Sequence, residues 1–186
     1  MKRNKFSLSH YNLLSMNMGR LVPIGIFEAL PGDTIQQATS ALIRVSPLLA
    51  PVMHPVSVKI HHWFVPTRLI WEDWEDFITG GEDGADASVL PTITFGSGVS
   101  SGTLADYLGV PLATGSLSVS ALPFRAYNEI YNEWYRDQDI QTPLTNSTAS
   151  GADSTSNTSL QYSCWAKDRD WETIPFIVNF IVSPER

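Results

Sequence analysis

The chain has little positive charge, a single cysteine and no long apolar segment. Lys and Arg number 12 among 186 residues, against 19 Asp and Glu, and charged residues make up only 17% of the chain. A protein with a net charge of −7 is poorly suited to bind nucleic acid over its whole surface, because phosphate contacts depend on Lys and Arg. Cys164 has no second cysteine with which to form a disulfide, which fits a reducing compartment, and we expect it to pack as a small hydrophobe.

Membrane and secretion signals are also missing from the sequence. Residues 1–10 carry positive charge but lack the apolar run of a signal peptide. The apolar stretch at residues 174–182 is much shorter than a bilayer span, and Pro175 and Asn179 interrupt it. We therefore expect no membrane partner.

The clearest local pattern is a strand that runs directly into a helix. Residues 56–65 alternate with the period of two that one packed sheet face requires. Pro66 should close the strand, and Thr67 stands at the N-cap position of a helix over residues 67–79. The glycine pair at residues 80–81 predicts the end of that helix.

A second helix is predicted over residues 122–137, where Pro123 suits the first turn and aromatic residues recur at helical spacing. Residues 145–159, TNSTASGADSTSNTS, contain no large apolar side chain and predict a mobile surface loop. Residues 30–33 predict a turn with Gly32 at its positive-φ position. Strands are predicted at residues 21–30, 34–45, 89–95, 161–165 and 176–183, and one helical turn capped by Thr103 at residues 103–108.

These elements indicate a mainly β fold with helices in the connections, because strands and helices do not alternate as a βαβ series would. The strands number about five or six, which is fewer than a jelly roll needs. Such a chain would leave sheet edges unpaired, so we expect it to aggregate or to need a partner when expressed alone.

Three long stretches resemble the major capsid proteins of the Microviridae, small single-stranded DNA bacteriophages, and in particular the gokushovirus group. The stretches are NMGRLVP with EALPGDT at residues 17–34, PVMH with HHWFVPTRLIW and WEDFITGG at 51–81, and LPFRAYNEIYNEWYRD at 122–137. Their order and spacing are similar to the N-terminal part of that family over roughly residues 6–167. After residue 168 the chain departs from the family pattern, and it is much shorter than a family member, so we hypothesise a truncated or frame-shifted gene product.

The resemblance implies a structural protein rather than an enzyme, without a cofactor. It implies an eight-stranded antiparallel viral jelly roll, incomplete here, that self-assembles with other virion proteins into a T=1 icosahedral shell around single-stranded DNA. The expected organisation is an N-terminal arm at residues 1–19, a partial jelly-roll domain at 20–168 and a divergent tail at 169–186. The expected location is the virion, assembled in the cytoplasm of the host bacterium.

Aromatic residues of the two helices are the candidate subunit interface. They are Trp71, Trp74, Phe77, Phe124, Tyr127, Tyr131, Trp134 and Tyr135. Within this set, helical spacing favours the core for Trp74 and Trp134, whereas Trp71 and Tyr135 are the better interface candidates. Lys2, Arg3 and Lys5 form the only basic cluster, which is either a solvated arm or an arm that contacts packaged DNA.

Other functions have less support. Exposed aromatic residues could serve a carbohydrate-binding β-sandwich module, and the loops at residues 80–103 and 145–159 could contact a host receptor. The acidic cluster Glu72, Asp73, Glu75 and Asp76 could form a hydrolase site, but a solvated helix face explains it better. His61 and His62 point to opposite faces of a strand, and with His54 they make a poor metal site, so no metal is expected.

Overall fold

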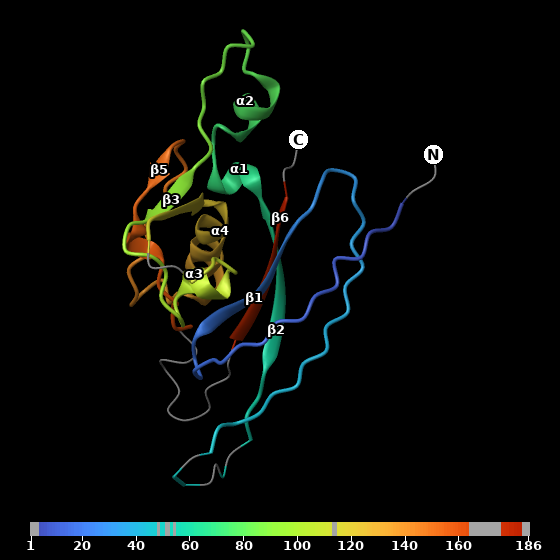
Figure 1. Cartoon of the computed structure of the whole chain (residues 1–186), viewed down its shortest axis with the longest axis vertical. Coiled ribbons are helices and arrows are strands. Elements are labelled where there is room, and N and C mark those ends of the chain that lie inside the picture. Colours follow the sequence, from blue (N-terminus) through green and yellow to red (C-terminus); the bar gives the residue numbers. More distant parts are fainter. Residues whose placement is uncertain are drawn as a thin grey trace.

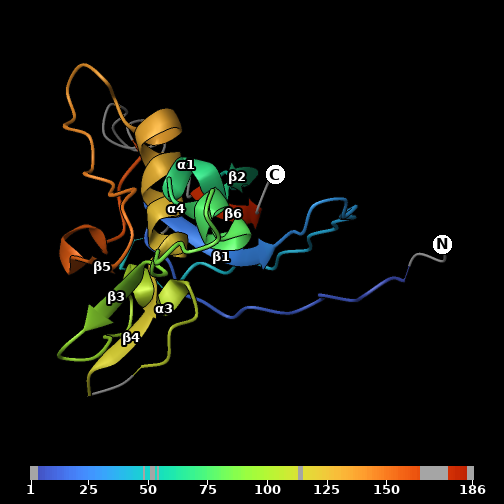
Figure 2. The same ribbon diagram turned by 90° about the horizontal axis from the view of Figure 1, so that it is seen from above.

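The computed structural model describes residues 4–47, 49–50, 53, 55–112, 115–163 and the backbone of 176–183. Two small three-stranded sheets lie on either side of a central helix, α4 (Leu122–Ile130), and a long extended segment leaves the body at the N-terminal end (Figures 1 and 2). Strands with helices in the connections are therefore confirmed.

The first sheet contains β1 (Leu21–Glu28), β6 (Phe176–Ser183) and β2 (Lys59–Pro66), in that order. Both β1 and β2 run parallel to β6, and their first residues Leu21 and Lys59 both pair with Phe176. The strands predicted at 21–30 and 176–183 are confirmed, and β1 lies at the edge of this sheet, a position that suits Pro23 because proline cannot donate to a ladder. This parallel pairing differs from the antiparallel sheet expected for a jelly roll. It arises because β6, which is distant in sequence, lies between β1 and β2.

Removal of β6 should have a large effect on solubility. A chain ending at residue 168 would leave β1 and β2 each without its described neighbour, and unpaired strand edges template aggregation. We expect this variant to elute in the void volume on size-exclusion chromatography. A chain ending at Ser183, which retains β6, is the matched control. A monodisperse chain ending at 168 with an unchanged melting temperature would show that β6 does not support the sheet.

The second sheet contains β4 (Leu117–Ser120), β3 (Thr92–Phe95) and β5 (Ala152–Asp153), in that order. β3 pairs antiparallel with β4 and parallel with β5. Between β3 and β4 lies α3 (Leu104–Tyr107), which follows Thr103 as predicted, although the Thr103 hydroxyl bonds Ser100 O rather than a helix N–H.

The helix predicted over residues 67–79 is broken in two. α1 (Thr67–Ile70) starts at Thr67 itself, after Pro66, and α2 (Trp74–Thr79) follows after three intervening residues. The break occurs because Glu72 N donates to Thr148 O at 3.1 Å, so this part of the backbone pairs with a distant segment instead of continuing the helix. α2 ends as predicted: Gly80 adopts a left-handed φ of 86° and its N–H bonds Asp76 O.

The second predicted helix is present but changes geometry. α4 is followed directly by a single π-helical stretch, η1 (Tyr131–Tyr135), closed by the Arg136 N–H to Tyr131 O bond of 2.9 Å. A π-turn holds one residue more than an α-turn, so it rotates the side chains that follow it. Tyr135 is thereby turned into the core, with 3% of its surface exposed, and Trp134 is turned out to 62% exposure.

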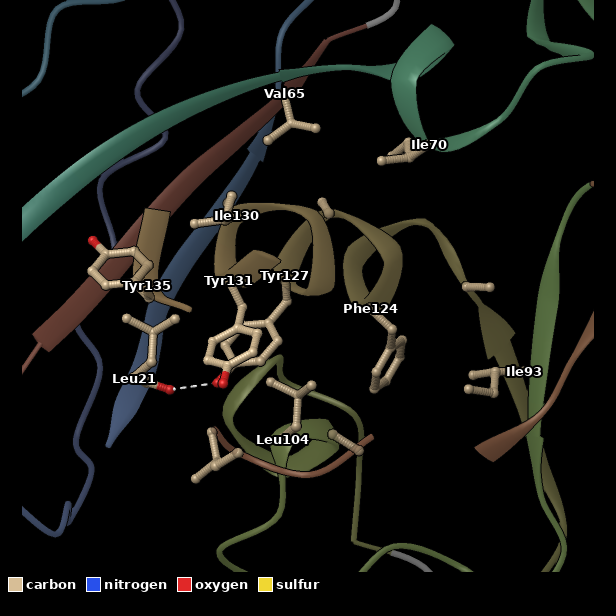
Figure 3. Packing of buried hydrophobic residues seen from close by; sticks show 14 of the residues in the cluster. Leu21, Val65, Ile70, Ile93, Leu104, Phe124, Tyr127, Ile130, Tyr131 and Tyr135 are labelled. Atoms are coloured by element: carbon tan, nitrogen blue, oxygen red, sulfur yellow. Dashed lines mark hydrogen bonds between the residues drawn. The ribbon is translucent and has the colours of Figure 1, made fainter. Parts of the chain in front are cut away.

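The core surrounds α4 (Figure 3). Leu21, Val65 and Ile70 contribute from β1, β2 and α1, and Leu104 contributes from α3. α4 presents Phe124, Tyr127 and Ile130, and the further members are Ile93, Val99, Ala105, Ala121, Ala126, Tyr131, Tyr135 and Leu160. The two sheets are therefore joined through one helix rather than packed face to face.

Two segments have no regular secondary structure. Residues 4–19 and 29–47 run extended, and the strand predicted at 34–45 is absent because no described segment pairs with it. The turn predicted at 30–33 is confirmed: Asp33 N bonds Leu30 O at 3.0 Å and Gly32 has a φ of 84°.

Candidate assembly surface

The centre of the structure is a buried arginine that the sequence did not reveal as important. Arg125, on α4, is 1% exposed. Its Nε donates to Oδ2 of Asp153 and its Nη2 to Oδ1, both at 2.7 Å. The same side chain donates to Ile70 O at 2.9 Å and to Ala149 O at 2.7 Å. One side chain thus joins α4 to α1 and to the segment at residues 145–159.

This segment was predicted to be a mobile surface loop, and in the structure residues 146–153 of it make hydrogen bonds to α4 and to residues 71–73. Asn146 donates to Arg125 O at 3.1 Å, Thr148 donates to the carboxylate of Glu72, and Ser150 O–H donates to Asp73 while accepting from Trp71 Nε1 at 2.9 Å. The segment contains β5 and the 3-10 turn η2 (Thr155–Asn157). Small polar side chains hold it through hydrogen bonds, although it buries no large apolar residue.

An aromatic cluster lies where α1 meets α2. The ring of Trp71 lies 5.6 Å from that of Trp74 and 5.0 Å from that of Phe77. Trp71 is fully buried, whereas Phe77 is 44% exposed and Trp74 is half-buried. The cluster therefore has a packed base and an open apolar side on α2.

A second aromatic cluster joins β2 to η1. The ring of Trp134 lies 4.8 Å from the ring of Trp63, and Trp63 Nε1 donates to the hydroxyl of Tyr135 at 3.3 Å. That hydroxyl also lies 2.5 Å from His61 Nδ1. An arrangement in which Tyr135 donates to a neutral His61 satisfies all three groups. Trp134 then covers the cluster and faces solvent.

Large apolar side chains are exposed along both extended segments. In the N-terminal arm, Phe6 is 84%, Tyr11 87% and Leu13 87% exposed, and in the second segment Leu42 is 90% exposed. Exposed apolar surface of this extent is typical of a surface that another protein segment covers.

Comparison with known proteins assigns the chain. Residues 1–176 match the family described as capsid protein (F protein). The chain belongs to this family. It is 39% identical over 141 residues to capsid protein VP1 of Bdellovibrio phage phiMH2K (74% of this chain, 26% of that protein) and 36% identical over 152 residues to VP1 of Chlamydia phage 1 (77% and 26%). Against capsid protein F of Escherichia phage G4 it is 32% identical over 130 residues (69% and 29%).

The predicted resemblance to Microviridae capsid proteins is confirmed by this assignment. The chain spans about a quarter of the length of the curated relatives it matches. Because the matched region ends at residue 176, β6 lies almost entirely beyond it.

The structure separates the eight aromatic residues predicted for the capsid interface. Five of them are buried within the chain itself: Trp71, Phe124, Tyr127, Tyr131 and Tyr135. Phe77, Trp74 and Trp134 reach the surface. Three assignments to core or interface within this set were wrong. Trp134 was expected in the core and is exposed, whereas Trp71 and Tyr135 were expected at the interface and are buried within the chain. The π-turn and the break after α1 cause these differences, and neither follows from regular helical spacing.

The other predicted site residues are dispersed. Glu75 and Asp76 are exposed on α2, and Glu72 and Asp73 accept hydrogen bonds from Thr148 and Ser150. No group of three His, Cys, Asp or Glu suitable for a metal occurs among the described residues, and no helix of that part is long and apolar enough to cross a membrane. Lys5 is exposed, while Lys2, Arg3, His54 and Cys164 lie outside the described residues.

The contact between His61 and Tyr135 predicts a loss of stability at mildly acidic pH. Burial, followed by the charges of Lys59 and His62, lowers the pKa of His61 below its usual 6.5. The unfolded chain therefore binds a proton at higher pH than the folded chain does, so this contribution to stability is complete above pH 6.5 and is lost as the pH falls below it.

We expect His61→Asn, which retains an acceptor, to reduce the drop in the guanidinium midpoint between pH 7.5 and pH 5.5. His10→Asn, at an exposed histidine of the N-terminal arm that is not among the groups lowering the pKa of His61, is the control and should behave as the unsubstituted chain. An equal drop in all three proteins would contradict the assignment.

Proposed function

We propose that the chain is a structural component of the icosahedral shell of a small single-stranded DNA bacteriophage, as the whole proteins of its family are named capsid proteins. One observation of the structure supports this function above others: apolar side chains are exposed along two extended segments that make no core of their own. A solitary globular protein would bury them, whereas a shell subunit covers them with its neighbours. This role is structural and requires no catalytic site or cofactor.

The eight-stranded jelly roll and the T=1 geometry are part of this proposal. The six strands found among the described residues do not make a jelly roll, so the complete architecture would need further strands beside β2 or β1. Location in the virion, assembly in the bacterial cytoplasm, contact with other virion proteins and contact of the loop at residues 80–103 with a receptor are proposed on the same basis. The carbohydrate-binding alternative is weakened, because most of the aromatic side chains it would use are buried.

Assembly can be tested directly. We would express the chain alone and together with the full-length VP1 of phage phiMH2K, and examine gradient fractions by negative-stain electron microscopy. We expect the chain in shell-like particles, by itself or incorporated beside the relative. Its recovery only as a soluble monomer in both experiments would overturn the proposal.

Trp134→Ala should reduce the yield of such particles without unfolding the chain. Trp134 is 62% exposed, so its truncation removes external contact area while the buried part of the cluster retains the Tyr135 hydrogen bonds. Ile140→Ala, at a residue that is 75% exposed, is the control and should leave the yield unchanged if Trp134 is a specific contact. A normal particle yield from Trp134→Ala would remove this residue from the interface.

A further inference from the structure

The negative charge of the chain is concentrated in one protruding element. Residues 72–90, comprising α2 and the loop after it, carry seven Asp and Glu and no Lys or Arg, so this acidic knob alone accounts for the whole net charge of −7. α2 stands apart from both sheets at one end of the molecule (Figure 1). None of its residues is buried.

Three of these seven carboxylates accept hydrogen bonds from other residues of the chain, and the other four accept none from the residues that the structure describes. Glu72 and Asp73 accept from Thr148 and Ser150, and Asp86 accepts from Ser88. The remaining four are exposed and have no ion-pair or hydrogen-bond partner on their carboxylates among the described residues: Glu75, Asp76, Glu82 and Asp83.

Apolar side chains lie beside these carboxylates. Ile78 is 58% and Phe77 44% exposed on α2, and Val89 is 61% exposed at the end of the knob. A surface that combines uncompensated acids with exposed aliphatic and aromatic side chains fits a segment that is both basic and apolar.

The N-terminal arm of the same sequence has this composition. Residues 1–19 contain Lys2, Arg3 and Lys5 and no acid. Phe6 and Leu8 follow the charges directly and are 84% and 61% exposed. Phosphate groups would neutralise the charges of such a segment but would leave its apolar residues in water, so a protein surface is the better complement.

The arm contacts its own chain through β1 and through α3, where the Tyr107 hydroxyl donates to Ser15 O. Asn12 donates to Ile24 O at 3.1 Å and the ring of His10 lies 5.3 Å from that of Phe27, so these alternate residues face β1. Tyr11 and Leu13, on the opposite side, are each 87% exposed. From β1 the arm extends out to one side of the body (Figures 1 and 2), and it lies apart from α2 (Figure 1).

We propose that the N-terminal arm of one copy docks on the acidic knob of a neighbouring copy. Lys2, Arg3 and Lys5 would pair with the exposed carboxylates, and Phe6 and Leu8 would cover Phe77 and Ile78. This inference rests on the proposed shell function, because it names the contact through which copies join. Because the arm lies apart from the knob of its own chain, the contact is one between chains.

A cross-linking experiment with two different chains tests the contact. Both chains carry Cys164→Ser; one then carries Phe6→Cys and the other Ile78→Cys. We expect a disulfide-linked heterodimer after mixing and mild oxidation, on a non-reducing gel. Ile140→Cys, at an exposed residue outside the knob, replaces Ile78→Cys in the control and should give no such product. Absence of the product with Ile78→Cys, or an equal product in the control, would overturn the proposal.

Charge reversal tests the electrostatic part. Glu75→Lys with Glu82→Lys in the knob should lower the cross-link yield by about tenfold, because two attractions become repulsions. Glu133→Lys with Asp139→Lys makes the same charge change elsewhere on the surface and should leave the yield unchanged. Lys2→Glu with Lys5→Glu in the arm should restore the yield against the reversed knob. No loss on reversal, or no restoration, would contradict the pairing.

The particle experiment separates this inference from the proposed function. If particles form but residue 6 does not cross-link to residue 78, the docking proposal fails and the capsid function stands. If a single-stranded oligonucleotide abolishes the cross-link and binds through Lys2 and Lys5, the arm belongs to DNA and the proposal is likewise overturned. Absence of both particles and cross-link would count against the capsid function itself.

Discussion

Replacement of Arg125 by methionine is expected to lower the free energy of unfolding by about 3–5 kcal/mol, which is a large part of the stability of a domain of this size. Methionine fills a similar volume but leaves the Asp153 carboxylate without its cation. The carbonyls of Ile70 and Ala149 also lose their donors. When a buried ion pair loses one partner, the free energy of unfolding falls for two reasons. The attraction between the charges is lost, and the remaining charge stays buried without a partner.

The guanidinium midpoint, followed by tryptophan fluorescence, measures this effect. Arg44→Met, at an exposed residue of the extended segment, is the matched control and should change the free energy by less than about 0.5 kcal/mol. The double variant Arg125→Met with Asp153→Leu should recover part of the loss, because the unpaired charge is gone. An Arg125→Met protein as stable as the unsubstituted chain would show that the ion pair contributes nothing net.

The role of Arg125 could have been suspected from the sequence in part. A helix with apolar residues at Phe124, Ala126, Tyr127 and Ile130 is buried around much of its circumference, so an arginine within it needs a partner. Asp153 is the only acid of the segment at residues 145–159. The composition of that segment nevertheless predicted mobility, because hydrogen bonds from Ser, Thr and Asn to a distant helix leave no periodic pattern in the sequence.

Local signals were reliable where they act within a few residues. Gly80 ends α2 and Gly32 makes its turn, since both effects depend on the backbone of neighbouring residues. The family could also be recognised, because three long stretches agree in order and spacing.

Pairings between distant segments were not predictable in the same way. The break between α1 and α2 depends on the hydrogen bond from Glu72 N to Thr148 O, which joins positions 76 residues apart. The position of β6 between β1 and β2 depends on a segment far along the chain, and alternation alone gives neither its neighbours nor its direction. The segment at residues 34–45 is the opposite case. It has the sequence pattern of a strand, but no described segment pairs with it, so it remains extended and exposed.

Trp134 was expected in the core and Tyr135 at the surface, and the structure shows the reverse for a similar reason. In a regular α-helix, residues 127, 131 and 134 share a face, and Trp134 would be buried. One π-turn at η1 moves that face to Tyr135. The hydrogen bonds of the Tyr135 hydroxyl with His61 and Trp63 of β2 accompany this choice, and the sequence of the helix alone does not contain them.

Tyr127→Phe should be the most damaging removal of a single oxygen atom in the chain. The Tyr127 hydroxyl donates to Leu21 O at 2.9 Å and accepts from Gln161 N at 2.9 Å, so it joins α4 to the start of β1 and to the segment that pairs beside it (Figure 3). Tyr127 is fully buried, and burial raises the pKa of its hydroxyl far above the ordinary value, so the group is protonated and can donate at neutral pH.

Phenylalanine would leave both a carbonyl and an N–H without a partner where water has little access, and each such group costs about 1–3 kcal/mol. We therefore expect a loss of about 2–4 kcal/mol in the free energy of unfolding, measured by guanidinium titration. Tyr162→Phe, which removes a hydroxyl from a 47% exposed ring and retains the contact of that ring with Arg20, should be nearly neutral. If the two substitutions had equal effects, the Tyr127 hydroxyl would not be what holds β1 against α4, and packing of the ring alone would account for the junction.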